Sequence, residues 1–261
     1  MKLIDAHCHL EPKDFPTTAE VIARAREQGV VHAVVVGQFQ KPGDFGFALE
    51  VARAHPDFLT PSMGIHPHDA AAALPADWLE LERLCALPEI AAVGETGLDY
   101  FYNHSPKAEQ VEAFHRQCGL AKQLKKPVII HVRDAHDECV EVLRSEGMRE
   151  GMIHCFTGDT DAARKYLDLG FFLSISGVVT YKKSEALQAA VTFAPIDRLM
   201  VETDSPFLAP LPFRGKKNEP GHVGHTARKV AELKSMDPDE AALTCARNTQ
   251  QLLRLKADLE G

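Results

Sequence analysis

Short apolar runs alternate along this chain with segments that carry helix start and stop signals. The runs cover residues 3–4, 33–36, 59–65, 90–93, 128–130, 152–153, 171–175 and 199–201. Continuous apolar runs of this kind are typical of strands in a parallel sheet, which are covered on both faces. The pattern therefore predicts a repeated strand–helix order along the chain.

The segments between these runs contain residues that begin and end helices. Thr17, with Glu20 three positions later, predicts an N-terminal cap, and Gly29 predicts the end of that helix. Asp237 followed by Pro238 predicts the start of the last helix. The helix expected after Ser105 and Pro106 has an apolar face made of Val111, Phe114, Cys118, Ala121 and Leu124.

About eight strand–helix units fit two architectures. A closed (β/α)8 barrel, or TIM barrel, has about 250 residues, close to the 261 residues of this chain. An open doubly wound sheet is the main competitor. Because no linker-like stretch interrupts the pattern, we expect the TIM barrel as a single α/β domain over residues 1–261.

Two histidines follow the first apolar run. His7 and His9 are two positions apart, so in a strand both side chains point to one side while Cys8 points to the other. Imidazoles that converge in this way are typical of a metal site. Taken alone, a hydrogen-bonded pair of surface histidines explains them equally well.

Four later runs also lead into residues that can bind metal ions, namely Glu95, His131, His154 and Asp204. In a barrel every parallel strand ends on the same face, so these side chains would meet those of the first run. Taken singly, Glu95 could be a helix cap or an ion-pair partner. Together the set predicts a metal site, with Glu202 in a structural role and Asp99 ordering the next loop.

Five blocks of sequence resemble the TatD family of deoxyribonucleases, in the order in which that family has them. They are residues 7–9 (HCH), 94–100 (GETGLDY), 131–134 (HVRD), 154–158 (HCFTG) and 202–206 (ETDSP). Residues 64–68 (GIHPH) and 213–220 (FRGKKNEP) resemble two further motifs, so the match spans nearly the whole chain. Thr96, Val132 and the Gly221–His222 pair depart from the family pattern, which leaves the metal ligands intact but the substrate preference open.

The resemblance implies a two-metal hydrolase. One divalent ion would be bound by His7, His9, Glu95 and Asp204, and the other by His131, His154 and a bridging Glu95. Two ions about 3.5–4 Å apart acidify water and polarise a phosphoryl oxygen. Asp204 would orient the attacking water and accept its proton, unless it is a ligand only. Zinc, magnesium, manganese and cobalt all suit these ligand types.

Basic residues near the expected barrel mouth are candidates for binding a phosphate backbone. They are Arg133 and the basic loop Arg214, Lys216 and Lys217, although such loops are more often solvated surface. His66 could contact a phosphate or leaving oxygen, and His68 is expected in a nearby loop. Aromatic residues 100–102 could stack on an unpaired base, but packing under loops is the more common use.

Composition excludes several other classes of protein. No apolar run approaches the about 20 residues of a membrane span, and the six cysteines form no C-x-x-C pair. The N-terminal residues lack an export signal, so we expect a cytoplasmic protein, with no obligatory protein partner. The net charge of −8 argues against broad adhesion to nucleic acid but allows a small site neutralised by metal ions.

Three classes of function are compatible with these observations. The first is a deoxyribonuclease that removes nucleotides from single-stranded DNA ends, 3′ to 5′ as the resemblance implies. The second is a metal-dependent hydrolase of another ester or of an aminoacyl-RNA linkage. The third is a non-catalytic protein stabilised by metal, which is disfavoured because structural sites are usually closed whereas this one would have an open mouth. We predict the first.

Overall fold

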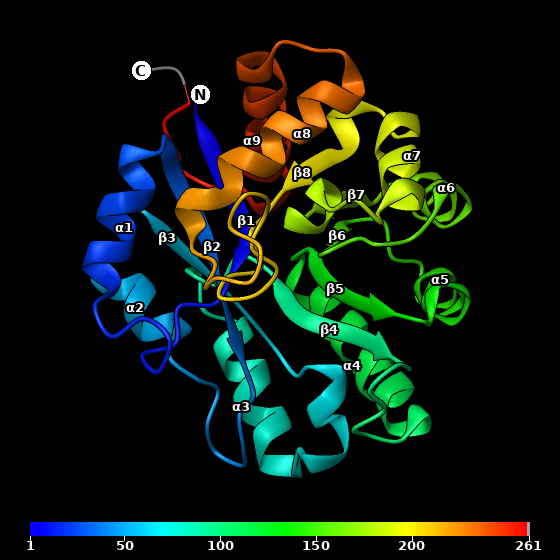
Figure 1. The fold of residues 1–261 in the computed structure, drawn as a ribbon. Coiled ribbons are helices and arrows are strands. Elements are labelled where there is room, and N and C mark those ends of the chain that lie inside the picture. Colours follow the sequence, from blue (N-terminus) through cyan, green and yellow to red (C-terminus); the bar gives the residue numbers. More distant parts are fainter. Residues whose placement is uncertain (260–261) are drawn as a thin grey trace.

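The computed structural model, which describes residues 1–259, is a ring of eight parallel strands surrounded by helices (Figure 1). Each strand pairs with the next one along the chain, and every pairing is parallel. The single α/β barrel expected from the sequence is thus confirmed. The strands are β1 (Leu3–Cys8), β2 (Val30–Gln38), β3 (Leu59–Gly64), β4 (Val93–Asp99), β5 (Val128–Arg133), β6 (Gly151–Ile153), β7 (Phe172–Ile175) and β8 (Leu199–Val201).

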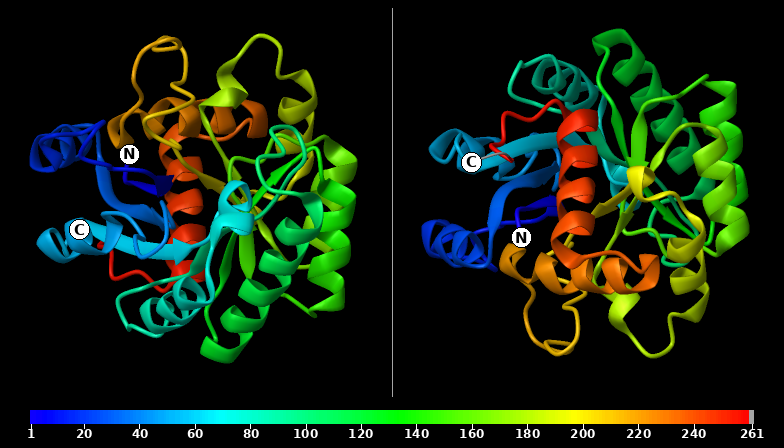
Figure 2. Two further views of the ribbon diagram at one scale, coloured as in Figure 1. Left: turned by 90° about the horizontal axis from the view of Figure 1, so that it is seen from below. Right: turned by 90° about the horizontal axis from the view of Figure 1, so that it is seen from above.

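Helices lie outside the strand ring in both views of Figure 2. The helix starts predicted at Thr17 and Asp237 are confirmed, and the Asp237 side chain accepts hydrogen bonds from the backbone N–H groups of Asp239 and Glu240. Within residues 1–259, no helix is long and apolar enough to cross a membrane. The helices are α1 (Thr18–Glu27), α2 (Ala48–Ala54), α3 (Pro75–Cys85), α4 (Lys107–Leu124), α5 (His136–Ser145), α6 (Thr160–Asp168), α7 (Glu185–Phe193), α8 (Val223–Lys234) and α9 (Pro238–Leu253), with 3-10 turns at Pro67–Ala72, Gly177–Thr180, Ile196–Arg198 and Pro220–His222.

Strand β4 differs from its prediction. The apolar run at 90–93 suggested a strand that ends before Glu95, whereas β4 begins at Val93 and includes Glu95. The ladder continues because Thr96 pairs with Ile130 and Asp99 pairs with Arg133 on β5. Hydrogen bonding between backbones does not require apolar side chains, so the strand extends into the polar motif.

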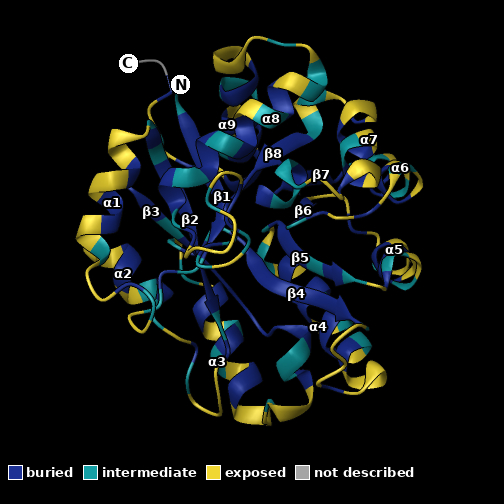
Figure 3. Ribbon diagram, in the orientation of Figure 1, coloured by how far each residue is buried: buried dark blue, intermediate teal, exposed yellow. Residues whose placement is uncertain are grey.

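The apolar core has two parts, and Figure 3 shows buried residues along the strands and on the inner sides of the helices. One part fills the space between strands and helices. The other lies inside the ring, where Ile129, Met152 and Met200 are fully buried together with residues from the end of α9 and the segment after it, such as Leu253 and Leu255. This inner cluster forms a packed base below the polar residues.

Two irregularities in the strands aim polar side chains into the ring. Between Asp5 and Cys8, β1 uses three residues where β2 uses two, and β4 shows the same excess over β5 between Val93 and Thr96. An extra residue of this kind is a β-bulge, which reverses the inward–outward alternation beyond it. Inward-facing Ile4 and Ala92 are therefore followed, three positions later, by His7 and Glu95, which also lie in the site.

Gly94, inside the second bulge, is a position that only glycine can occupy. Its φ is 144°, and an added Cβ would lie 2.4 Å from the carbonyl oxygen of Ile129. Both the backbone conformation and the close approach of β5 exclude a larger residue. The packing of the barrel therefore explains why a glycine directly precedes Glu95.

Hydrogen bonds between β1 and the segment after β8 bring the two ends of the sheet together. The N–H of Asp204 donates to the carbonyl of His7 at 2.9 Å, and the N–H of His9 donates to the carbonyl of Ser205 at 2.8 Å. Below them, the buried Asp5 carboxylate accepts from the N–H and the hydroxyl of Thr203. These contacts place Asp204 beside His7 of β1 and His9 just after it.

Candidate metal centre

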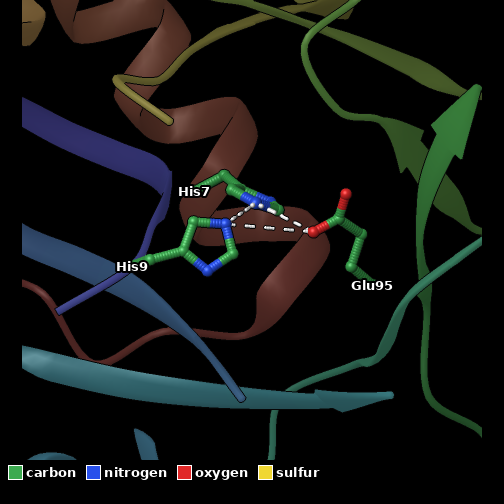
Figure 4. Close-up of side chains that lie close together, drawn as sticks. All are labelled: His7, His9 and Glu95. Carbon is green, nitrogen blue, oxygen red and sulfur yellow. Dashed lines mark hydrogen bonds and ion pairs between the residues drawn. The ribbon is translucent and has the colours of Figure 1, made fainter. Parts of the chain in front are cut away.

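The buried carboxylate of Glu95 lies between two groups of histidines. Its Oε2 atom is 3.5 Å from Nε2 of His7 and 3.9 Å from Nε2 of His9 (Figure 4). Its Oε1 atom is 2.8 Å from Nε2 of His154 and 3.0 Å from Nδ1 of His131. Each carboxylate oxygen therefore faces a different pair of imidazoles.

The first group contains His7, His9 and Asp204. The Nε2 atoms of the two histidines are 3.3 Å apart, which confirms that they converge as the sequence predicts, while the Cys8 thiol donates away from them to the carbonyl of Val34. The Oδ1 atom of Asp204 lies 3.4 Å from His9 and 3.8 Å from His7. Its side chain is 14% exposed, so it is accessible from the cavity as well.

In the second group, two further carboxylates hold the histidine rings from behind. Nε2 of His131 lies 3.0 Å from Oδ2 of Asp99, and Nδ1 of His154 lies 3.1 Å from Oε1 of Glu202. A carboxylate at the rear nitrogen accepts its N–H and orients the ring, so that a bound cation would take the place of the proton on the front nitrogen. Both front nitrogens point at Glu95, the arrangement that metal-binding histidines commonly show.

His66 is also close to Glu95, but its hydrogen bonds are different. Its Nδ1 atom accepts a hydrogen bond from the backbone N–H of His68 at 3.1 Å, and its Nε2 atom lies 3.4 Å from Oε1 of Glu95. Burial lowers the pKa of His66 to about 4, so the ring is neutral at pH 7. The proton of the neutral ring is therefore on Nε2. In this tautomer Nε2 faces Glu95 as a hydrogen-bond donor, and it has no free lone pair to offer.

The charge state of the site also suits cations. Burial alone would raise the pKa of Glu95, but the neighbouring His154 imidazole and the hydrogen bonds from His131 and His154 outweigh it and hold the pKa well below its usual value. Burial likewise acts to raise the pKa of Asp204, but the hydrogen bond that it accepts from His9 and the nearby imidazoles outweigh burial and lower the pKa. Both carboxylates are ionised at neutral pH.

The donor set fits divalent cations. Three groupings place their ligand atoms within 4.8 Å of one another: His7, His9 and Glu95; His66, Glu95 and His131; and His7, His154 and Glu202. Imidazole nitrogens with carboxylate oxygens are ligands for zinc and related ions. Two buried polar atoms of the site, Nδ1 of His7 and Oε2 of Glu202, have no hydrogen-bond partner in the described structure. The chain itself therefore does not satisfy every polar atom of the site.

A cavity of about 770 Å³ opens above these groups, lined by Glu95, His131, His154 and Asp204 among others. Of the residues expected to bind substrate, His66 and Arg133 line this cavity. Arg214 and Lys217 do not line it, and neither does Lys216. The Arg214 guanidinium lies over the ring of Tyr181, 4.4 Å from its centroid. The Lys217 ammonium donates to the carbonyl of Asp14 at 2.6 Å.

Two residues of the site were not identified from the sequence. Gln38, the last residue of β2, donates from Nε2 to Oε2 of Glu95 at 2.6 Å. It follows the apolar run at 33–36, and this position after a run is a signal that could have identified it. Phe207 lies on the rim of the cavity, and its position depends on the loop after β8.

Comparisons with known proteins agree with this arrangement. The family described as TatD related DNase matches residues 4–254. A Bacillus subtilis protein named YabD, an uncharacterized metal-dependent hydrolase, is 41% identical over 256 residues, which are 97% of this chain and 99% of that protein. An Edwardsiella piscicida protein named 3′-5′ ssDNA/RNA exonuclease TatD is 35% identical over 243 residues, 90% of this chain and 93% of that protein. The crystal structure of YJJV, a TatD homolog from Escherichia coli K12, matches with a TM-score of 0.89 and 27% identity, over 97% of this chain and 98% of that chain.

Proposed function

We propose that this chain, which belongs to the TatD-related DNase family of metal-dependent hydrolases, is an exonuclease that removes nucleotides from single-stranded DNA ends, 3′ to 5′. The observation that carries the proposal is the pair of histidine groups on either side of Glu95. The relative named as a 3′-5′ ssDNA/RNA exonuclease supports this choice of substrate and direction.

Two divalent cations are part of the proposal. His7, His9, Glu95 and Asp204 would hold one, and Glu95, His131 and His154 would hold the other. When bound, such cations polarise a phosphoryl oxygen, acidify water and offset the charge that develops during displacement. Glu202 and Asp99 keep the rings of His154 and His131 oriented, and Gln38 donates to Glu95, so the ligands are held in place before substrate arrives.

Asp204 is the proposed acceptor for the proton of the attacking water. Its carboxylate is ionised at neutral pH and accessible from the cavity, and its backbone is held to His7 by a hydrogen bond. A general base must have both a free lone pair and reach to the water. Asp204 therefore orients the water at Oδ1 or Oδ2 and takes its proton.

His66 and Arg133 are the proposed contacts to the phosphate. The Nε2–H group of His66 points into the site and can donate to a phosphoryl or leaving oxygen. Arg133 supplies a guanidinium on the cavity wall. We propose that the basic loop of Arg214, Lys216 and Lys217 contacts the strand farther from the bond that breaks, because it lies outside the cavity lining.

The small number of cations at the mouth favours a strand end over a long duplex. Of the lysine and arginine side chains, only Lys13 and Arg133 line the described cavity, beside several carboxylates. A strand that contacts about 2–4 phosphates loses affinity with salt at a slope of roughly −1.5 to −3, because single strands contribute about −0.7 per neutralised phosphate. A shallow salt dependence is therefore expected.

End-labelled oligonucleotides test the proposal directly. Purified protein with zinc, magnesium, manganese or cobalt is incubated with linear single-stranded DNA labelled at either end, with the same strand closed into a circle, with RNA and with a small ester. We expect stepwise shortening from the 3′ end, poor cutting of the circle and no activity after chelation. Equal cutting of circular and linear DNA contradicts end specificity, and inert DNA with rapid ester turnover contradicts the nuclease assignment.

The Asp204→Asn variant tests the proton acceptor. It removes the base while keeping the shape of the side chain, so kcat should fall by about 100-fold or more with little change in KM. An unchanged kcat would exclude a catalytic role for Asp204.

A further inference from the structure

Phe207 is a large apolar side chain that lies in water beside the metal centre. Its side chain is 60% exposed, although the residue lines the same cavity as Glu95 and Asp204. Its ring centroid is 6.3 Å from that of His9, in an edge-to-face orientation. The core does not explain this position, because most of the ring is not packed against the protein.

The backbone of Phe207 is firmly held although its side chain is exposed. Its N–H donates to the carbonyl of Asp204 at 2.9 Å, and its carbonyl accepts from the amide of Asn218 at 2.7 Å. Asn218 is fully buried and also donates to the carbonyl of Thr203. The ring is therefore presented at the rim from a rigid support, which reduces the entropy lost when a ligand binds.

Two aromatic residues next to Arg133 are also exposed, Phe101 by 56% and Tyr102 by 52%, but both are in contact with a cation. Tyr102 contacts both Arg133, whose guanidinium carbon is 4.7 Å from its ring centroid, and His104, whose ring is nearly parallel with centroids 5.7 Å apart. Phe101 is also covered by Arg133, at 3.9 Å. These rings hold the Arg133 guanidinium in position, whereas the contact described for the Phe207 ring is the edge-to-face one with His9.

We propose that Phe207 stacks on the unpaired base of a nucleotide next to the bond that breaks, while Arg133 contacts a phosphate on the opposite side of the metal centre. This inference rests on the proposed function. Stacking requires a base that is out of a duplex, and every base has a face that can stack, so the contact selects single strands without selecting sequence. Stacking on Phe207 would also add binding affinity to that provided by the few lysine and arginine side chains at the cavity.

The experiment combines removal of the ring with removal of the base. Oligonucleotides carry a single abasic site at the last, second-last or third-last nucleotide, and their binding is measured by fluorescence anisotropy in the Asp204→Asn background, which keeps them intact. In the protein that retains Phe207, an abasic site at one of these positions should weaken binding, relative to the intact oligonucleotide, by about 5- to 150-fold. This is the effect of one lost stacking contact. With Phe207→Ala added, that same position should cause no further loss.

Two variants serve as controls. Phe207→Trp keeps a stacking face and should restore the penalty of the abasic site. Phe193→Ala removes another partly exposed phenylalanine, at the end of α7 and outside the cavity lining, and should leave binding unchanged. An abasic penalty that is the same with and without Phe207, at all three positions, overturns the inference.

The same measurements separate this inference from the proposed function. If the oligonucleotides bind with the expected dependence on Phe207 but the wild-type protein does not cleave them, the stacking contact stands and the exonuclease assignment fails. If they are cleaved from the end but the abasic penalty is independent of Phe207, the exonuclease assignment stands and the stacking contact fails.

Discussion

The two ends of the barrel interior have opposite chemistry, although the same strands build both. Ile129 and Met152 belong to the apolar base, and His131 and His154, two positions farther along the chain, belong to the candidate metal centre. Two residues of a strand span only about 6.6 Å. The polar layer therefore lies directly above the apolar layer. A shift of one strand by two residues would move a histidine into the apolar layer or an apolar residue into the polar layer.

This difference indicates which layer stabilises the fold. Burying an apolar side chain contributes about 1.5–3 kcal/mol, whereas a buried charge is costly unless it is paired. The apolar residues of the base should therefore stabilise the folded state. The polar residues at the mouth should serve catalysis and contribute little to stability, or lower it. Variants in the two layers should separate these properties.

The largest effect is expected for Glu95→Gln in the mouth. This change removes charge from the carboxylate between the two histidine groups, so both cations should be lost and kcat/KM should fall about 1,000-fold or more. His131→Ala should chiefly affect one cation. Elemental analysis counts the metals, and circular dichroism checks the fold. Two cations retained in Glu95→Gln would contradict the bridging role.

The opposite result is expected for Ile129→Ala in the base. The side chain is fully buried, so its truncation should lower the free energy of unfolding by about 2–5 kcal/mol. Activity per folded molecule should remain. Urea denaturation measures the stability, and Leu79→Ala, at a 66% exposed position on α3, is the matched control with a change of about 0.5 kcal/mol or less. Loss of activity in folded Ile129→Ala would contradict the separation between a base that stabilises the fold and a mouth that serves catalysis.

His32, near the start of β2, is a polar exception close to the base. It is buried and its Nε2 lies 2.8 Å from the Thr60 hydroxyl, while its Nδ1 has no partner. Burial lowers the pKa of His32 to about 4, and the nearby charges of Asp57 and Arg26 act in opposite directions.

Acid should therefore destabilise the protein through His32. Above pH 6.5 the residue is neutral in both the folded and the unfolded chain, so it makes no difference. Between pH 6.5 and about 4 only the unfolded chain takes up the proton, and stability should fall by roughly 2–3 kcal/mol. Urea denaturation at several pH values should show a smaller fall for His32→Gln. Equal slopes for the two proteins would contradict the prediction.

The smallest effect is expected from the basic loop, which lies outside the cavity lining. Arg133 lines the cavity, so Arg133→Ala should raise KM for an oligonucleotide about 10-fold or more, as expected for a lost charge-assisted hydrogen bond. Arg214 instead stacks on Tyr181 outside the lining, and Arg214→Ala should change KM by about threefold or less. Steady-state kinetics compare the two, and equal changes would place both in contact with the strand near the metal centre.

The sequence by itself determined the alternation of strands and helices and the types of residue in the site, and it favoured a closed barrel over an open doubly wound sheet. Eight apolar runs separated by helix signals specify parallel strands covered by helices, because burial on both faces requires continuous apolar residues. Residues such as His131 and His154 directly follow these runs, and parallel strands all end on one face. Their convergence could therefore be predicted without coordinates.

Only the tertiary structure decided how these side chains face one another. The bulges that turn His7 and Glu95 inward depend on pairing between β1 and β2 and between β4 and β5, and no local pattern reveals such a shift of register. The tautomer of His66 depends on the backbone of the following turn. The exposure of Phe207 depends on a loop held by Asn218, eleven residues away along the chain. The bulges are fixed by pairing between strands, and the His66 tautomer and the Phe207 position by the conformation of a turn and a loop. A one-dimensional pattern of apolar and polar residues contains neither.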